Sequence, residues 1–508
     1  MRPPCSRPSM DTVRTPSAVS DEPWDLLVIG GGTAGLVAAY TGASLGARTA
    51  LVERDRTGGD CLWTGCVPTK ALIHAATAVS QARAGASFLS SDSGAAGPVE
   101  VDLPAVMAHV QRSIATIEPV DSPEALREAG VTVLAGEARF AGPDSVSVDG
   151  RTQRFHRAVV ATGASPTLPP IDGVADATVW TSESMWDVST LPGRLLVIGG
   201  GSVGCELGQA FARLGSAVTL VEQTSRLLPR EDADAGRVVL EALRADGVDV
   251  RLRHTASKIV PDLTGVGEAV LTGPSGEEHV GYDAVLVAVG RTPRTASMGL
   301  DRAGVRLTPS GAVEVTSTGR TSNPRVWAAG DVTPSPHLTH LAAAEAAAAA
   351  SNALLGLRRS VDPLAVPRVV YTDPEVAAVG VTTDTDRLPD GVRVTTRHHD
   401  HVDRAIVDRR TDGFARLAVE RGGRVVGATI VGPRAGESIA EMTLAVRTRT
   451  SVTRLADTVH AYPTYADGPW NAAVDDVRRR LAHPVLQRAS RAVVALRRTR
   501  SAGRARDR

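Results

Sequence analysis

The sequence predicts an α/β protein in which one strand–glycine turn–helix–strand unit occurs twice and an α+β domain follows. At 508 residues the chain exceeds what one hydrophobic core usually supports, so about three domains are expected. The repeated unit lies at 25–54 and again at 195–222. After Pro367, short apolar strands precede helical stretches in a pattern typical of an α+β domain.

Composition excludes several classes of protein. The charge is balanced, with 56 basic and 56 acidic residues, so no nucleic-acid partner is expected. Four cysteines without disulfide-like spacing favour the reducing cytoplasm. Residues 1–22 lack an apolar core, so they predict a disordered tail rather than a secretory signal. No apolar run is long enough for integral membrane association.

The first unit has the features of a dinucleotide site. An apolar strand at 26–29 leads directly into a glycine turn. Gly30 would make the tight turn, Gly32 would let the backbone approach a pyrophosphate, and Gly35 would let the helix pack on the strand. Glu53 ends the next strand, where its carboxylate can accept hydrogen bonds from a ribose.

A close cysteine pair follows in the stretch GGDCLWTGCVPTK. Cys61 and Cys66 are five residues apart, and a helix is expected at about 62–78. Residues five apart in a helix differ by about 500° in direction, so the sulfurs can meet only where the first turn is distorted. No second pair or nearby histidines complete a zinc site, so no metal site is predicted. The pair is interpreted as redox-active.

The second unit repeats the glycine turn and predicts a nicotinamide-nucleotide site. Gly199, Gly201 and Gly204 correspond to the three glycines of the first unit. Glu222 ends the next strand, and a carboxylate there favours a ribose 2′-hydroxyl and therefore NADH. Arg226 and Arg230 are close enough in sequence to accommodate a 2′-phosphate instead.

The cysteine stretch resembles the CxxxxC segment of the pyridine nucleotide–disulfide oxidoreductases, the family of dihydrolipoamide dehydrogenase, glutathione reductase and mercuric reductase. The resemblance implies that the first unit binds FAD and the second binds NAD(P)H. It also implies that Cys66 lies against the flavin while Cys61 exchanges with the acceptor. Lys70, one of only two lysines in the chain, would lie near the flavin N5 and pair with Glu206.

Three further segments resemble motifs of the same family. They lie at 159–164, 285–294 and 325–333. Asp331 is implied to bond the ribityl chain and Arg291 to lie near the nicotinamide cofactor. The cofactor-binding residues implied in the three segments are Thr162, Gly163, Gly290, Arg291, Gly330 and Asp331.

The resemblance also implies a domain organisation and a homodimer. The domains expected are an FAD-binding domain at 23–165 and 291–360, an NAD(P)-binding domain at 166–290, a dimerisation domain at 361–480 and a basic C-terminal tail at 481–508. For that tail a docking helix with a disordered end is expected, and contact with an anionic membrane or a partner is the alternative.

The chain departs from the family at the residues that move protons. Tyr462 and Asp467 stand where disulfide reductases of the family have the catalytic His and Glu of the partner subunit. Tyrosine, with a pKa of about 10, is a poorer proton shuttle at neutral pH than histidine. Mercuric reductases also have tyrosine here but add a C-terminal cysteine pair, and this chain has no cysteine after Cys205. His460 is two residues out of position on an extended segment.

The sequence therefore predicts an FAD-dependent NAD(P)H oxidoreductase that passes electrons through Cys61 and Cys66 to a small acceptor, namely a disulfide, a metal ion or a quinone. One alternative is a flavoprotein that reduces its acceptor directly at the flavin. Another is a redox-sensing nucleotide-binding module. The cluster His398–His401 is interpreted as a solvated strand rather than a metal site, because adjacent strand residues point to opposite faces.

Overall fold

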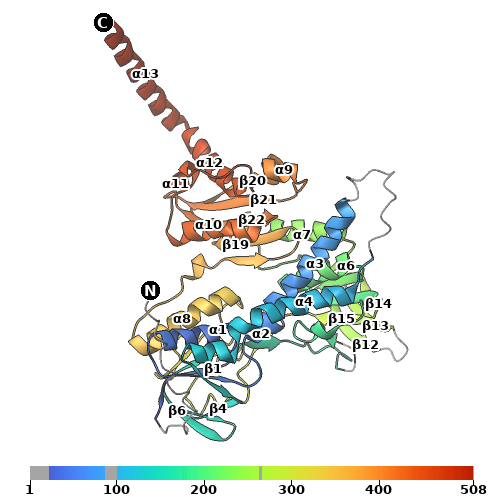
Figure 1. Cartoon of the computed structure of the whole chain (residues 1–508). Coiled ribbons are helices and arrows are strands. Elements are labelled where there is room, and N and C mark those ends of the chain that lie inside the picture. The colour runs from blue at the N-terminus through green and yellow to red at the C-terminus, as the bar shows by residue number, and fades with distance from the viewer. Residues whose placement is uncertain are drawn as a thin grey trace, which may run out of the picture.

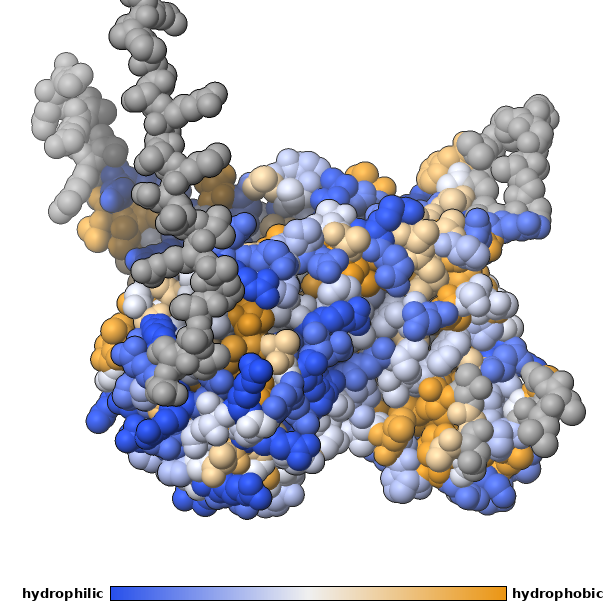
Figure 2. All heavy atoms as spheres, turned by 60° about the horizontal axis from the view of Figure 1, so that its bottom comes forward, coloured by the Kyte–Doolittle hydropathy of each residue, from blue (hydrophilic) through white to orange (hydrophobic). Residues whose placement is uncertain are grey.

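The structure is a computed structural model that describes residues 22–85, 88, 100–175, 177, 179–261 and 266–506, with side chains up to residue 498. Except for Glu22, the N-terminal tail expected at 1–22 lies outside this range. Three large sheets organise the described chain (Figure 1). In these residues no helix is both long and apolar enough to cross a membrane. Hydrophilic side chains cover much of the face shown in Figure 2, with hydrophobic ones in separate groups between them.

The first sheet has a parallel core in the order β3-β2-β1-β6-β17, and an antiparallel pair, β4 and β5, extends from the long strand β6. Its central strand is the apolar run that the sequence predicts, and it is almost completely buried. The strands are β1 (Trp24–Ile29), β2 (Thr49–Glu53), β3 (Thr132–Ala135), β4 (Ala138–Gly142), β5 (Ser145–Val148), β6 (Arg151–Val160) and β17 (Val326–Ala328).

Helices α1 and α8 pack together on this sheet, and α3 and α4 connect it to the second one (Figure 1). Gly30 has φ +103° and Gly35 lies so close that a Cβ there would be 1.7 Å from the Gly30 carbonyl oxygen. Both positions therefore require glycine, as the sequence predicts. The helices are α1 (Thr33–Ser44), α2 (Gly59–Trp63), α3 (Cys66–Gly85), α4 (Leu103–Ile117), α5 (Pro123–Glu128) and α8 (Thr339–Leu355).

The second sheet is fully parallel in the order β11-β10-β9-β15-β8, and a small antiparallel sheet, β12-β13-β14, lies beside it. A Cβ on Gly204 would lie 1.9 Å from the Gly199 carbonyl oxygen, so the glycine turn repeats the packing of the first unit. The elements are β8 (Val179–Trp180), β9 (Arg194–Ile198), α6 (Ser202–Leu214), β10 (Ala217–Glu222), α7 (Ala233–Ala245), β11 (Asp249–Leu252), β12 (Thr255–Val260), β13 (Gly267–Gly273), β14 (Gly276–Tyr282) and β15 (Ala284–Val287). A short pair, β7 (Ala164–Pro166) and β16 (Arg291–Pro293), connects the two large units.

The third sheet is antiparallel in the order β18-β19-β22-β21-β20, and helices α10 to α12 share its core. The α+β domain expected after Pro367 is therefore present. Helix α13 continues from it, away from the three sheets (Figure 1). The elements are β18 (Arg368–Val370), β19 (Glu375–Gly380), β20 (Val392–His398), α9 (Asp403–Val407), β21 (Phe414–Glu420), β22 (Val425–Gly432), α10 (Ala435–Arg447), α11 (Val452–Asp457), α12 (Asp467–Leu481) and α13 (Pro484–Arg506).

Two local predictions were wrong. The single helix expected at 62–78 is two helices, because the chain leaves helical geometry at Thr64 and Gly65. The histidine cluster is not a solvated strand: β20 ends at His398, and His399–His401 forms a 3-10 turn that buries His399. Burial lowers the pKa of His399 to about 4, and neither of its ring nitrogens has a hydrogen-bond partner in the described structure.

A buried ion-pair network fixes the second unit against the third domain. Arg416 of β21 bonds Asp232 and Asp234 at 2.8 Å each, and its side chain is only 8% exposed. Arg368 of β18 holds Glu231 in the same way. Removal of one member of a buried ion pair leaves its partner desolvated without compensation.

Arg416→Met should therefore lower the free energy of unfolding by about 3 to 5 kcal/mol in urea denaturation. Arg237→Met is the matched control, since Arg237 also pairs with Asp234 but is 58% exposed. Arg237→Met should lower the free energy of unfolding by less than about 1 kcal/mol. Equal losses in the two variants would contradict this account of the network.

Candidate active site

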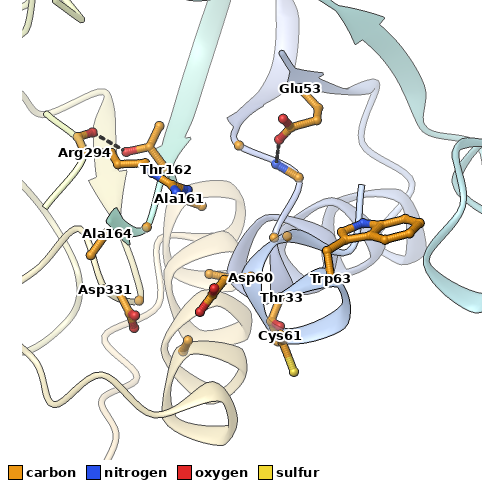
Figure 3. Close-up of a pocket in the computed structure, with 18 of the residues that line it drawn as sticks. Thr33, Glu53, Asp60, Cys61, Trp63, Ala161, Thr162, Ala164, Arg294 and Asp331 are labelled. Atoms are coloured by element: carbon orange, nitrogen blue, oxygen red, sulfur yellow. Dashed lines mark hydrogen bonds between the residues drawn. The ribbon is translucent and has the colours of Figure 1, made fainter. Parts of the chain in front are cut away.

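A cleft opens where the parallel strands of the first sheet end (Figure 3). The residues that follow β1, β2, β6 and β17 line it, as do α2 and the N-terminus of α8. The lining residues predicted as cofactor-binding are Gly30, Gly32, Glu53, Thr162, Gly163, Arg291, Gly330 and Asp331. The segments at 159–164, 285–294 and 325–333, which are far apart in sequence, thus meet at one cleft.

The glycine turn is held by Glu53. Its carboxylate accepts from the Gly31 N–H at 2.6 Å (Figure 3). It also accepts from the Asp55 N–H at 2.8 Å. Helix α1 begins after Gly32 without a side-chain cap, which leaves backbone N–H donors at its N-terminus. Such donors, together with the helix dipole, bind phosphate.

The second unit reproduces this arrangement. Glu222 accepts from the Gly200 N–H at 2.8 Å and from the Thr224 N–H at 2.7 Å. Helix α6 begins after Gly201, also without a side-chain cap. Two nearly identical anion-binding turns therefore occur in one chain, each with a carboxylate at the end of the neighbouring strand.

The opposite wall of the cleft carries polar groups. The Thr162 hydroxyl donates to the Arg294 carbonyl oxygen at 2.8 Å (Figure 3). Asp331 follows β17 and lines the cleft, and burial raises the pKa of its carboxyl group. Both residues are in positions where they could contact a bound dinucleotide.

Arg291 lies in the same cleft, and the expectation that it is near the nicotinamide cofactor stays a prediction. Its guanidinium donates to the Ala164 carbonyl oxygen at 2.8 Å and to Glu183 at 3.0 Å, and it lies 3.3 Å from Asp60. Because the short β7–β16 pair carries Arg291 back towards the first sheet, the residue belongs to the connection between the two units.

The break between α2 and α3 brings the two cysteines together. Cys61 lies on α2, and Cys66 is the first residue of α3. Both are half-buried free thiols that interact with each other. The distorted turn that the sequence required is thus present. Cys61 lines the cleft, so the expectation that Cys66 faces the flavin stays a prediction.

The surroundings of the pair favour a thiolate on Cys66. A hydrogen bond from Cys61 is the largest effect, and the Thr339 hydroxyl at 3.1 Å and the charge of Lys70 act in the same direction. Together they lower the pKa of the Cys66 thiol from 9.0 to about 6. The same hydrogen bond, with burial, raises the pKa of Cys61 far above its ordinary value. At neutral pH the reduced pair carries its negative charge on Cys66.

Lys70 is held by an ion pair that joins all three domains. Its ammonium lies 2.6 Å from the Glu206 carboxylate, as predicted, and Glu206 is only 5% exposed. The other oxygen of Glu206 accepts from the Tyr371 N–H at 2.9 Å. The Tyr371 ring lies 4.3 Å from the Lys70 nitrogen, within range of a cation–π contact.

Tyr462 and Asp467 lie in the third domain and outside the lining of the cleft. The exposed Tyr462 hydroxyl donates to Asp403 at 2.5 Å, and this bond raises its pKa. Asp467 is buried at the start of α12, where it accepts from the Thr464 N–H. His460 is held by Glu441 at 3.0 Å. Within one chain, none of the three reaches the dithiol.

Thr339 and Tyr371 are the site residues that sequence reasoning missed. Tyr371 is 165 residues from Glu206, and Thr339 is 273 residues from Cys66. Contacts over such separations leave no local pattern. One indirect signal was present for Thr339, because it begins the alanine-rich helix that follows the segment at 325–333.

Comparisons with known proteins agree with this geometry. Residues 24–346 match the family model described as pyridine nucleotide-disulphide oxidoreductase, and residues 366–473 match the dimerisation domain of the same family. A mercuric reductase from Shigella flexneri is 39% identical over 90% of this chain and 84% of its own length. A dihydrolipoyl dehydrogenase from Thermus scotoductus is 37% identical over 89% of this chain and 96% of its own length.

Solved structures give the same result. The Cu(II) complex of the HOCl-induced flavoprotein disulfide reductase RclA from Escherichia coli has a TM-score of 0.79 at 26% identity, and the match covers 89% of this chain and 99% of that one. LpdA from Mycobacterium tuberculosis has a TM-score of 0.79 at 29% identity, and the match covers 90% of this chain and 100% of that one.

Lys70→Met should raise the pKa of Cys66, because a nearby positive charge stabilises the thiolate. The alkylation rate of Cys66 in reduced protein should rise with a midpoint near pH 6 in the wild type. In Lys70→Met the midpoint should move upward by about 1 pH unit or more. Peptide mass spectrometry after iodoacetamide pulses at a series of pH values measures this.

Lys258→Met is the matched control, since Lys258 is the other lysine of the chain and pairs instead with Asp172. In Lys258→Met, the dependence of Cys66 alkylation on pH should match that of the wild type. A Cys66 midpoint above pH 8 in the wild type would contradict the proposed stabilisation of the thiolate.

Proposed function

Because the chain belongs to the pyridine nucleotide-disulphide oxidoreductase family, whose members use FAD and NAD(P)H, we propose that it passes electrons from NADH through Cys61 and Cys66 to a small acceptor. The observation that supports this most strongly is the dithiol itself. Two half-buried thiols interact beside the FAD cleft, and their surroundings separate their pKa values.

The residues of the first cleft fit FAD. Uncapped N–H donors of α1 suit the pyrophosphate, Glu53 lies where a ribose would be bound, and Asp331 faces the cleft from the opposite wall. FAD bound there would supply two-electron chemistry between NADH and the Cys61–Cys66 disulfide, which those two electrons reduce to the dithiol. The protein supplies the orientation of the thiols and the charge near them.

Each turnover of the dithiol releases two electrons as an S–S bond forms between Cys61 and Cys66. Cys66 is already deprotonated near neutral pH, so only the Cys61 proton must leave. The raised pKa of Cys61 makes that proton difficult to remove without a base. Disulfide acceptors also need a proton on the leaving thiol, and Tyr462 is a weak donor for that purpose.

We therefore favour acceptors that need no acid catalyst for a leaving thiol, a thiophilic metal ion or a quinone, over a small disulfide. The mercuric reductase relatives favour the metal ion. Residues 206–508 contain no cysteine, so the proposal takes the metal ion directly to Cys61 and Cys66. The alternative, in which the acceptor is reduced directly at the flavin, makes the dithiol dispensable.

The second unit supports NADH over NADPH. Glu222 occupies the position where a 2′-phosphate would be repelled. Arg226 is not directed to that position: its guanidinium donates to the Pro229 carbonyl oxygen and lies 3.8 Å from Asp384 of the third domain. Of the two arginines that could have bound a phosphate, one is thus already engaged elsewhere.

A homodimer completes the proposal. The dimerisation domain matched at 366–473 exposes large apolar side chains, which usually mark an interface. These are Ile406, Val407, Leu444, Val459 and Tyr462. A second copy packed there would bring its own Tyr462 towards the dithiol, which Tyr462 does not reach within one chain.

Gly32→Ala should fold but lose flavin. A Cβ there would have only ordinary contact, 3.7 Å from Gly59, yet it would occupy the surface that a pyrophosphate approaches. Gly201→Ala is the matched control in the second unit, where a Cβ also has open space. It should retain flavin and raise the KM for NADH. Flavin content of the purified variants measures the difference, and full retention in Gly32→Ala argues against this site.

Cys61→Ser should reduce acceptor turnover to background, while NADH still bleaches the flavin absorbance. Cys205→Ala, which changes a buried cysteine outside the dithiol, should keep turnover. A panel of mercuric ion, quinones, lipoamide and glutathione disulfide identifies the acceptor. Turnover that is unchanged in Cys61→Ser would support direct reduction at the flavin.

The wild type should use NADH with a kcat/KM at least about tenfold above that for NADPH, a difference of about 1.4 kcal/mol. Glu222→Gln should narrow this ratio, because it removes the charge that repels the 2′-phosphate. Steady-state kinetics with both nucleotides test it, and a preference for NADPH in the wild type would refute the assignment.

A further inference from the structure

The C-terminal helix α13 has no role in the proposed oxidoreductase chemistry. It runs for 23 residues, which corresponds to about 35 Å, and Figure 1 shows it directed away from all three sheets. It contacts α12, the helix from which it continues. The large side chains described along it are exposed, including Val485, Leu486 and Val493.

The sequence of α13 separates apolar from basic residues. Val485, Ala489, Val493 and Leu496 follow one another at intervals of four, four and three residues, which places them on one face. Arg488, Arg491 and Arg498 lie off that face. Between Val485 and Leu496 the helix thus has a narrow apolar stripe, with arginines on its other faces.

The charge of this region has one sign only. From Val477 to Arg506 there are ten arginines and not one aspartate or glutamate. The rest of the chain must therefore carry the opposite excess, since the total is 56 basic against 56 acidic residues. Positive charge is thus concentrated on a segment that includes α13, the helix that extends away from the three sheets (Figure 1).

We propose that α13 docks the protein on the surface of a membrane that contains anionic phospholipids. The arginines would lie among the phosphate head groups, and the stripe of Val485, Val493 and Leu496 would enter the boundary of the acyl chains. The helix would lie in the plane of the interface. It would not cross the bilayer, which agrees with its arginine content.

Charge complementarity selects this partner over two others. A second copy of α13 would bring arginines against arginines, with no carboxylate on either helix to pair with them. A nucleic acid would satisfy the arginines but would leave the apolar stripe in water. Of these three partners, the anionic lipid surface is the one that matches both the arginines and the apolar stripe.

The test uses the full-length, FAD-loaded protein and co-sedimentation with vesicles. Strong binding is expected to mixed phosphatidylcholine–phosphatidylglycerol vesicles and weak binding to pure phosphatidylcholine, and added salt should weaken the former. A chain that lacks residues 484–508 should not bind. Its NADH-dependent turnover with a soluble acceptor should be unchanged, because the proposed site lies elsewhere.

Point variants separate the two features. The combined change Arg488→Gln, Arg491→Gln and Arg498→Gln should lower partitioning on the order of a hundredfold. Val493→Ser should lower it by about tenfold. Val494→Ser is the matched control, because Val494 points about 100° away from Val493 around the helix, and it should have a smaller effect.

Three results would overturn the proposal. One is equal binding to the two kinds of vesicle, and another is vesicle binding that survives removal of residues 484–508. The third is preferential binding of labelled duplex DNA or RNA over mixed vesicles in competition.

Discussion

The carboxylate of Glu206 is the constraint on which the site depends. It is almost fully buried on α6 of the second unit, and each of its oxygens is used. One binds Lys70 of α3 and the other accepts the backbone N–H of Tyr371 from the third domain. A buried carboxylate without such partners would be strongly destabilised, so the three domains must meet in this arrangement. Lys70 is thereby fixed beside Cys66, and the position of the ammonium contributes to the thiolate character of that cysteine.

Much of this could be predicted from the sequence, because the determinants are local. The glycine turns, the buried strands before them and the carboxylates after them occur within about 30 residues, and the structure forms both units as expected. The requirement for a distorted turn between Cys61 and Cys66 also came from simple helix geometry. The distortion at Thr64 and Gly65 lies within the first turn of the expected helix, but a separate short helix before it, α2, was not predicted.

What the sequence could not provide were contacts between distant segments. Thr339 and Tyr371 reach the dithiol and its lysine only after the first sheet, the second unit and the third domain have assembled. The contacts of Arg291 with Glu183 and Asp60 could not be predicted for the same reason, because they form only when the short β7–β16 pair brings these segments together. The sequence assigned His399 to a solvated strand only because adjacent strand residues point to opposite faces. In the structure, Tyr465 and neighbouring glycines pack against His399 and bury it. Each difference arises from tertiary packing, which a pattern along the chain does not contain.

The central claim is that NADH, through the flavin, reduces a disulfide bond between Cys61 and Cys66. Labelling of cysteines in the isolated enzyme, before and after anaerobic addition of NADH, tests it most directly. We predict that the peptides containing Cys61 and Cys66 become alkylated only after NADH is added, while the buried Cys205 stays unlabelled in the native protein in both states. If NADH reduces the flavin but the labelling of Cys61 and Cys66 does not change, the dithiol is not in the path of the electrons.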